Sequence, residues 1–381
     1  MHTGMRTLTA LLLSDGRPGH YHLSDGVIAA VRRLQPVRVF RLEVCRRWLG
    51  CVLATLTNAR IPADWLLRMG YGLPAAQLPQ PDFIVSAGAE TLAANIAIAR
   101  LTGAPNIFCG TLRRYSPDGL RLVLTSYASH AERPRHVLVL KPSALGRDEL
   151  GRRPDGWCKL AHPQRQFGLL LGGDSRECRY ELDEWMQLLD LVERSHQVLG
   201  VDWLISNSRR TPAAVSDLVA KHASASSAIA SFVDVRTVGH GTLDRVLGRA
   251  QAVVCTDDSS TMISECVSAG IPVLGVRPNA TKFTPDERAY RQYLIDNGWY
   301  RSVPIAGLTP RSLLDELSRI RPLSENPLDK LAAILREHLP ELFFEADSKV
   351  GKKAIKPDLP RPLDPPSAPL PFPPAAQLEI R

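Results

Sequence analysis

The 381-residue sequence lacks the features that most readily mark a membrane-spanning, disulfide-stapled or nucleic-acid-binding protein. No apolar run approaches the roughly 18 residues that a helix needs to cross a bilayer. Neither a zinc-finger spacing nor an aromatic ribonucleoprotein signature is present, so we expect no nucleic-acid partner. No Cys-X-X-Cys pair occurs, and the odd number of cysteines favours free, buried thiols in a reducing compartment. These cysteines are Cys45, Cys51, Cys109, Cys158, Cys178, Cys255 and Cys266.

The positive charge of the chain is not concentrated in one segment. The formal net charge is +8, yet the lysines and arginines form no long run. Such an excess suits anionic small molecules or an anionic membrane surface. The short apolar patch near the N-terminus is expected to be a first strand, because it is too short for a signal peptide and no cleavage site follows. We therefore expect a cytoplasmic protein able to act at the inner face of a membrane.

Short apolar runs alternate with amphipathic stretches, which is the pattern of parallel sheets covered by helices. Strands are predicted at 7–13 and 37–44, and helices at 23–34, 46–72, 90–101, 180–199, 260–269 and 285–297. The pattern indicates an α/β protein with two Rossmann-like domains, residues 1–155 and 165–340, separated by a Gly-, Pro- and Arg-rich connector.

Residues 341–381 differ in composition from the rest of the chain. They are basic and then rich in proline, so we expect a disordered tail. A ligand for a proline-binding groove and a basic membrane-contacting segment are the functional alternatives.

The stretch Ser14–His22, SDGRPGHYH, directly follows the first predicted strand. A loop at the carboxyl edge of the first strand of an open α/β sheet faces the ligand crevice. Gly16 and Gly19, with Arg17 between them, would let a bound group approach the backbone, and a helix N-terminus favours anions. We count these three residues as candidates for substrate binding.

His20 is the candidate general base of this stretch. An imidazole suits proton abstraction near neutral pH, and Asp15 or Asp25 could orient it. A turn whose histidine merely caps the helix fits the spacing equally well. His20 and His22 also suggest a metal site, but no further cluster of ligand residues is visible, and we expect none.

Two loops of the second half combine glycine, hydroxyl and arginine residues. Gly172 and Gly173 end a strand ahead of a helix and can offer backbone N–H groups to phosphate. In the loop Ser208–Thr211, Arg209 and Arg210 precede a helix N-terminus and could clamp a diphosphate. A plain turn and a solvated arginine pair are the structural alternatives.

The segment TDDSSTMISECV carries the most informative pattern. A strand ends at Asp258, Ser259 and Ser260 begin a helix, and Glu265 falls in its second turn. A carboxylate there can accept two hydrogen bonds from a ribose diol, while the helix start meets phosphates. Met262 lies between these groups and is included in the predicted site. Ser260 could equally be a simple N-cap.

Four motifs give the chain a family resemblance. DGRPGH, LLGGDSRECRY, SNSRRTP and TDDSSTMISECVSAGIPV occur in this order between residues 15 and 272. In this respect the chain resembles the mitochondrial-fission "elongated mitochondria" family and its bacterial relatives, glycosyltransferases of the two-Rossmann GT-B architecture. The resemblance implies two Rossmann-like domains facing across a cleft, with a nucleotide-sugar donor bound mainly by the second.

The chain departs from the family pattern at two places. Tyr21-His22-Leu23 stands where the family commonly has Glu-Asn-Gln, and His240–Leu243 stands near the position of an Asn-Pro-Tyr segment. Both departures are expected to line the cleft, so the donor and acceptor cannot be transferred from the family.

The resulting expectation is a metal-independent glycosyltransferase that needs no cofactor beyond its nucleotide-sugar co-substrate. His20, oriented by Asp15, would take the proton of the acceptor hydroxyl, and Glu265 would bind the ribose or the donor sugar. The diphosphate would be held by Gly172, Gly173, Arg209 and Arg210, with Ser259 and Ser260 on the phosphates. The expected acceptor is a cell-envelope glycan or a lipid-linked precursor. The alternatives are a catalytically inactive GT-B scaffold that recruits a partner at a membrane surface, and a nucleotide-sugar epimerase.

Overall fold

The structure is a computed structural model that describes residues 6–151, 165–239 and 241–343. Cys158, His240, much of the connector and the predicted tail from residue 344 onward lie outside the described residues. Within the described ranges, no helix combines the length and the hydropathy needed to cross a membrane.

The first half contains a parallel six-stranded sheet in the order β2-β1-β3-β4-β5-β6. The apolar run of β1 is buried on both faces, because helices cover both sides of the sheet. Leu11 and Leu13 pack with residues of α4 on one face, and Ala10 and Leu12 pack with residues of α1 and α13 on the other. The strands are β1 (Leu8–Ser14), β2 (Val37–Glu43), β3 (Phe83–Ala87), β4 (Asn106–Cys109), β5 (Leu122–Thr125) and β6 (His136–Leu138).

The second half contains a second parallel six-stranded sheet, in the order β10-β9-β7-β11-β12-β14. The alternation seen in β1 recurs here, since Leu169 packs beneath α6 whereas Leu170 packs with residues of α10 and α11. The strands are β7 (Arg165–Leu170), β9 (Val201–Ser206), β10 (Ile229–Val233), β11 (Ala252–Thr256), β12 (Val273–Arg277) and β14 (Tyr300–Pro304); β8 (Cys178–Arg179) pairs with β13 (Ala280–Thr281). Both sheets confirm the predicted α/β class with two Rossmann-like units.

The helices begin and end as follows: α1 (Pro18–Arg32), α2 (Gly50–Asn58), α3 (Ala63–Tyr71), α4 (Leu92–Thr102), α5 (Ala128–Ala131), α6 (Leu182–Leu199), α7 (Ala213–Ala225), α8 (Val235–Val238), α9 (Asp244–Leu247), α10 (Ser260–Ser268), α11 (Pro285–Asp296), α12 (Pro310–Ser318) and α13 (Pro327–His338). Short 3₁₀ segments lie at Ala75–Gln77, Pro117–Gly119 and Pro340–Leu342.

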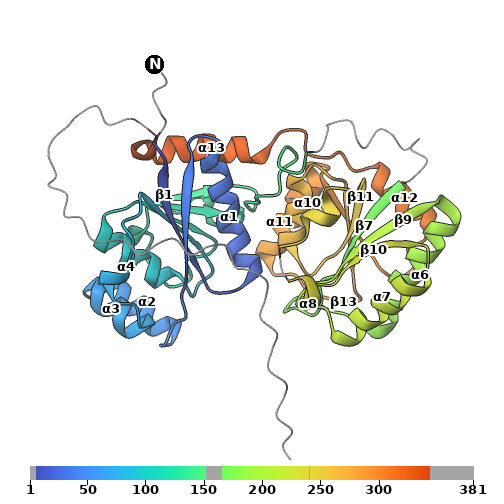
Figure 1. The fold of residues 1–381 in the computed structure, drawn as a ribbon, viewed down its shortest axis with the longest axis horizontal. Helices are drawn as coiled ribbons and strands as arrows, with labels where there is room; N and C mark the ends of the chain where they lie inside the picture. Colours follow the sequence, from blue (N-terminus) through green and yellow to red (C-terminus); the bar gives the residue numbers. More distant parts are fainter. Residues whose placement is uncertain (1–5, 152–164, 240, 344–381) are drawn as a thin grey trace, which may run out of the picture. The chain divides into compact units, whose positions relative to one another are not determined.

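The last helix returns to the first half. Leu331 and Leu335 of α13 are buried with residues of α1 and β1, and α13 packs directly against α1 (Figure 1). The sequence interpretation grouped residues up to 340 with the second half. The packing of α13 instead closes the core of the first half.

The order of the strands places the loops that matter most. In each sheet the chain crosses over its first strand, between β1 and β3 in the first half and between β7 and β11 in the second. The loops after these strand pairs border the crevice where open α/β sheets bind ligands. These loops are residues 15–17, 88–91, 171–177 and 257–259.

Two predicted helices differ in extent from the observed ones. α1 starts at Pro18 rather than residue 23, with proline in its first turn, so His20 lies inside the helix. The predicted helical region 46–72 divides into α2 and α3, because Arg60 adopts a left-handed conformation (φ 56°) and Pro62 follows.

Candidate functional site

A buried carboxylate holds a histidine at the start of α1. His20 Nδ1 lies 2.7 Å from Asp15 Oδ2, and the Asp15 side chain has no exposed surface. Burial raises the pKa of Asp15, but the hydrogen bond and charge of His20 and the backbone N–H of Arg17 outweigh it, and the net pKa is lowered. An aspartate that accepts from Nδ1–H leaves Nε2 free to accept a proton, as in carboxylate–histidine pairs generally.

The loop after β3 shapes this pair from the other side. A Cβ on Gly88 would lie 2.3 Å from His20 Nδ1 and 2.9 Å from Asp15 Oδ2, and Gly88 has a φ of +88°. Only glycine allows both the conformation and the close approach. Asp25, the alternative orienting group, instead pairs with Arg41. The structure therefore pairs His20 with Asp15, the partner given in the predicted site.

Next to the pair lies a cavity of about 500 Å³, which we call the His20 cavity. Its wall carries several cations, of which Arg17 pairs with Glu90 at 3.1 Å and Arg46 lies 3.8 Å from the same carboxylate. Arg113 lines it from a left-handed turn (φ 54°). Its other lining residues include Gly19, Gly88, Lys141, Ser260, Thr261 and Glu287.

A second cavity of about 200 Å³, the Arg209 cavity, lies between the start of α1 and the loops of the second sheet. Gly19 and Thr261 line both cavities, so the two are neighbours at the point where the first turns of α1 and α10 meet. The predicted residues that line the Arg209 cavity are Gly19, Ser208, Arg209, Arg210, Ser259, Met262 and Glu265.

The two adjacent arginines have different environments. Arg210 forms an ion pair with Asp258, whose side chain is fully buried and also accepts a hydrogen bond from Tyr180 Oη at 3.3 Å. Arg209 is exposed, and among the described residues it has no hydrogen-bond or ion-pair partner. Arg209 is thus the arginine available to a ligand, whereas Arg210 stabilises the loop.

The backbone N–H groups of the Gly172-Gly173 turn are hydrogen-bonded to side chains of the protein. The N–H of Gly172 donates to Thr256 Oγ1 at 2.6 Å, and the backbone of Gly173 donates to Asp258. A Cβ on Gly173 would lie 2.0 Å from the carbonyl oxygen of Arg210. The expectation that these N–H groups bind phosphate therefore needs correction, because both are already used and neither glycine lines the cavity.

Thr211 also contributes to the hydrogen bonds around the Gly172-Gly173 turn. Its hydroxyl donates to the carbonyl oxygen of Leu171 at 2.9 Å and accepts from the N–H of Ser208 at 2.9 Å. The side chain is buried. Thr211 and Asp258, both predicted to bind substrate, instead hold two strand-end loops together.

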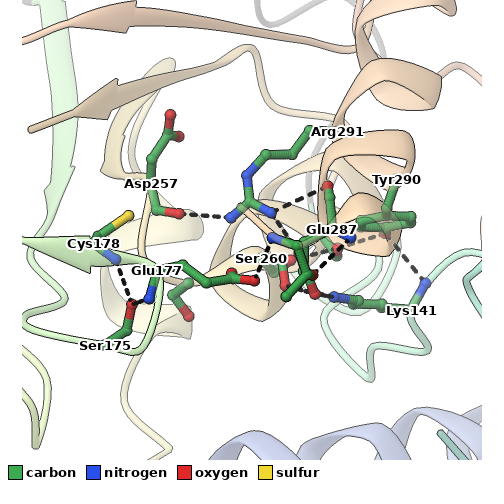
Figure 2. Close-up of polar contacts among 12 residues, drawn as sticks. Lys141, Ser175, Glu177, Cys178, Asp257, Ser260, Glu287, Tyr290 and Arg291 are labelled. Carbon is green, nitrogen blue, oxygen red and sulfur yellow. Dashed lines mark hydrogen bonds and ion pairs between the residues drawn. The ribbon is translucent and has the colours of Figure 1, made fainter. Parts of the chain in front are cut away.

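The start of α10 is connected to the first half by a polar network (Figure 2). Ser259 is the N-cap and accepts from the N–H of Met262. Lys141 Nζ donates to Ser260 Oγ and lies 2.9 Å from Glu287 Oε1, while Arg291 also pairs with Glu287. Burial would raise the pKa of Glu287, but the charges of Lys141 and Arg291 lower it to about 2. Lys141 and the carboxylate of Glu287, which accepts from Ser260 Oγ at 3.1 Å, thus both lie at the N-terminus of α10, where anions bind best.

Glu265 meets a residue of the first half. His22 Nδ1 lies 3.1 Å from Glu265 Oε1, and the Glu265 side chain is only 6% exposed. Burial lowers the pKa of His22, but the hydrogen bond and charge of Glu265 outweigh it, so the net pKa is raised above the usual value. The departure from the family pattern at His22 therefore contacts the carboxylate predicted to bind the donor.

The structure brings most of the predicted site to two adjoining cavities and removes a few members from it. Gly16 supports the turn before α1 with a φ of +72°, and Gly172, Gly173, Thr211 and Asp258 are structural. Sequence reasoning missed Lys141, Thr261, Glu287 and the contact of His22. A lone lysine in a connector has no local signal, and Glu287 looked like an ordinary first-turn acid of a helix. Among the described residues, no three His, Cys, Asp or Glu side chains gather in a metal-binding arrangement.

Several solved structures share this fold at low identity. One of them is the S. aureus MnaA–UDP co-structure (TM-score 0.52, 11% identity, 90% of this chain and 100% of that chain). Two others are a Listeria monocytogenes protein described as a "putative UDP-N-acetylglucosamine 2-epimerase" (0.52, 13%, 88% and 98%) and the UDP-GlcNAc 2-epimerase of Methanocaldococcus jannaschii (0.51, 12%, 87% and 99%). The likeness confirms the predicted GT-B-like architecture. No curated protein sequence matches the chain.

The sequence itself matches one family over most of its length. The match to the family described as Mitochondrial fission ELM1 covers residues 18–339. It includes α1 with His20, the loop with Arg209 and Arg210, and α10 with Glu265. The chain belongs to the Mitochondrial fission ELM1 family.

Proposed function

We propose that this protein transfers a sugar from a nucleotide-sugar donor to an acceptor hydroxyl. The observation that carries the proposal is the adjacency of the two cavities: the one beside the Asp15–His20 pair and the one beside Arg209 share Gly19 and Thr261. A transfer in which the acceptor attacks opposite to the leaving group needs a base on one side of the reacting carbon and a leaving-group site on the other.

The donor occupies the Arg209 cavity in this proposal. The exposed Arg209 and the N-terminus of α10 supply positive charge for a diphosphate, and Glu265 accepts hydrogen bonds from the ribose or the donor sugar. The S. aureus relative bound to UDP makes UDP the first nucleotide to test. We propose that Arg209 and the N-terminus of α10 neutralise the leaving diphosphate without a metal ion.

The acceptor occupies the His20 cavity. His20 Nε2 removes the proton of the acceptor hydroxyl, its oxygen bonds to the anomeric carbon, and the bond to the nucleoside diphosphate breaks. Asp15 holds the ring and stabilises the imidazolium that forms. A volume of about 500 Å³ suits a sugar-sized acceptor, and the arginines of the wall favour one with an anionic group, such as a cell-envelope glycan or a lipid-linked precursor.

Epimerisation of a nucleotide sugar is the second candidate, because the similar solved structures with a TM-score above 0.5 include UDP-GlcNAc 2-epimerases. The two reactions differ in what the donor alone yields. An epimerase converts UDP-GlcNAc to its epimer without an acceptor, whereas a transferase releases UDP only when water or an acceptor takes the sugar.

The experiment is a thermal-shift screen against nucleoside diphosphates and their sugar conjugates, followed by product analysis of each hit. We expect a stabilising shift with at least one nucleoside diphosphate, and slow release of that diphosphate from its sugar conjugate. Formation of an epimer without release supports the second candidate. The absence of any shift contradicts both enzymatic proposals and favours the inactive scaffold.

A further inference from the structure

We propose that one face of the first half docks on an anionic phospholipid surface. The face is formed by the start of α2 and the outer side of α3, and we call it the α2–α3 patch. It comprises Trp48, Leu49, Val52, Trp65 and Met69. The proposal does not depend on the chemistry proposed for the cavities, since vesicle binding can be measured without any substrate.

In the part of the chain that the structure describes, the patch leaves large apolar side chains exposed. Leu49 is 73% exposed, and Trp65 and Met69 are 41% and 42% exposed. Trp65 and Met69 are four residues apart and share a face of α3. Trp48 packs edge-on against Trp65 with ring centroids 5.5 Å apart, which joins the segment before α2 to α3. Contiguous exposed apolar groups of this kind mark interaction sites.

The charges around the patch select an anionic partner. Residues 45–72 contain Arg46, Arg47, Arg60 and Arg68 but a single acidic residue, Asp64. The N–H of Arg47 donates to the carbonyl oxygen of Gly70 at 2.7 Å, which holds this arginine beside α3. Tryptophan with arginine on one amphipathic surface is the composition that binds at the headgroup level of anionic bilayers.

A second exposed apolar face on the same protein shows the opposite charge. On α6, Leu182 and Met186 are 62% and 44% exposed. Residues 181–199 contain five acidic residues and one arginine, Arg194. The apolar exposure of the two faces is therefore similar, and only the α2–α3 patch is complementary to anionic lipid.

A second copy of the chain fits the patch less well. A symmetric dimer places the same surface of each subunit together, so the arginines around the patch would face one another. Like charges brought together at an interface oppose association. A phospholipid surface instead neutralises them.

The patch adjoins the His20 cavity. Arg46 lines that cavity and directly precedes Arg47 and Trp48. Tyr71, the last residue of α3, donates from Oη to the carbonyl oxygen of Glu90 at 2.7 Å, and Glu90 also lines the cavity. If the proposed transfer is correct, docking through the patch brings the acceptor cavity to a membrane-borne acceptor.

The first experiment compares matched apolar substitutions by co-sedimentation with vesicles of phosphatidylcholine containing phosphatidylglycerol. We expect wild type to bind these vesicles and not pure phosphatidylcholine, and L49S/M69S to bind at least roughly tenfold more weakly. L182S/M186S removes the same residue types from α6 and is expected to bind like wild type. Thermal unfolding and UDP titration of each variant separate loss of docking from loss of folding or of the proposed donor site.

The second experiment tests the charge. Arg68 and Arg194 both pair with an aspartate one turn earlier, at 4.0 Å and 3.3 Å. We expect R68E to weaken vesicle binding several-fold with a smaller salt dependence, and R194E to change neither. The proposal is overturned if wild type does not bind phosphatidylglycerol vesicles, or if the α6 variants lose as much binding as the patch variants. It is equally overturned if L49S/M69S abolishes a dimer in sedimentation velocity without affecting vesicles.

Discussion

In each half of the molecule, glycine-containing loops follow the central strands of the sheet. The two halves differ in whether these loops border a cavity or pack against each other. After β1 and β3, two loops place Asp15, His20 and Gly88 together and leave His20 on the wall of a cavity. After β7 and β11, the equivalent loops interlock, because Asp258 fills the space over Gly172. The loops after the central strands therefore border a cavity in the first half, whereas in the second half they pack against each other. In the second half, ligand contact passes to Arg209 and α10.

The largest effect on turnover is expected from substitutions in the Asp15–His20 pair. His20→Ala removes the proposed base and should lower turnover by at least roughly 100-fold while leaving nucleotide affinity nearly unchanged. Asp15→Asn, which keeps the shape but not the charge, should cost roughly 10²–10⁴-fold. Turnover by mass spectrometry is the measurement, with His222→Ala on α7 as the control. Unaltered turnover in His20→Ala would remove the residue from its role.

A substitution in the Gly172-Gly173 turn is expected to lower the stability of the protein. In Gly173→Ala the new Cβ meets the Arg210 carbonyl oxygen, and the free energy of unfolding should fall by about 1–3 kcal/mol. Gly19→Ala is the matched control, since its Cβ meets only Thr261 Oγ1 at 4.0 Å and its stability should stay within about 1 kcal/mol of wild type. Urea unfolding checks both. Equal losses in the two variants would mean that the turns do not differ as described.

The smallest effect is expected for the His22–Glu265 contact between the two halves, whose contribution to the free energy of unfolding depends on pH. The folded-state pKa of His22 is raised, so its stabilisation is fully present below the unfolded-state pKa and is lost as pH rises through the folded-state pKa. Glu265 and Asp25 favour the charged ring, and Arg41 opposes it. His22→Asn should therefore be less stable than wild type by about 0.5–1.5 kcal/mol at pH 5.5 and nearly equal to it at pH 8.5. A constant difference across this range, measured by urea unfolding, would contradict the assignment.

Much of the fold could be predicted because it depends on local patterns. The buried runs of β1 and β11 and the glycine or proline at helix ends are readable without tertiary information. The return of α13 to the first half could not be read, because an amphipathic helix does not indicate which sheet it covers. The division of 46–72 could have been found from Pro62, which interrupts the helical pattern.

The candidate site was predictable to the level of its loops but not of its individual contacts. The sequence predicts Gly172, Arg210 and Asp258 at strand ends of the second sheet. Only the structure shows that the N–H of Gly172 is bonded to Thr256 and that Arg210 pairs with Asp258. The contacts of Lys141 and His22 could not be predicted from the sequence, because their partners lie more than 100 residues away along the chain.

The most direct test is calorimetric titration of UDP, and of the other nucleoside diphosphates that give a thermal shift, into the wild-type protein and three variants. We expect Arg209→Ala to lose at least tenfold in affinity and His20→Ala to bind like wild type. Arg249 is exposed and lines neither cavity, so Arg249→Ala should also bind like wild type. Wild-type affinity in Arg209→Ala, or equal losses in Arg209→Ala and Arg249→Ala, would contradict the central claim that the Arg209 cavity holds the donor.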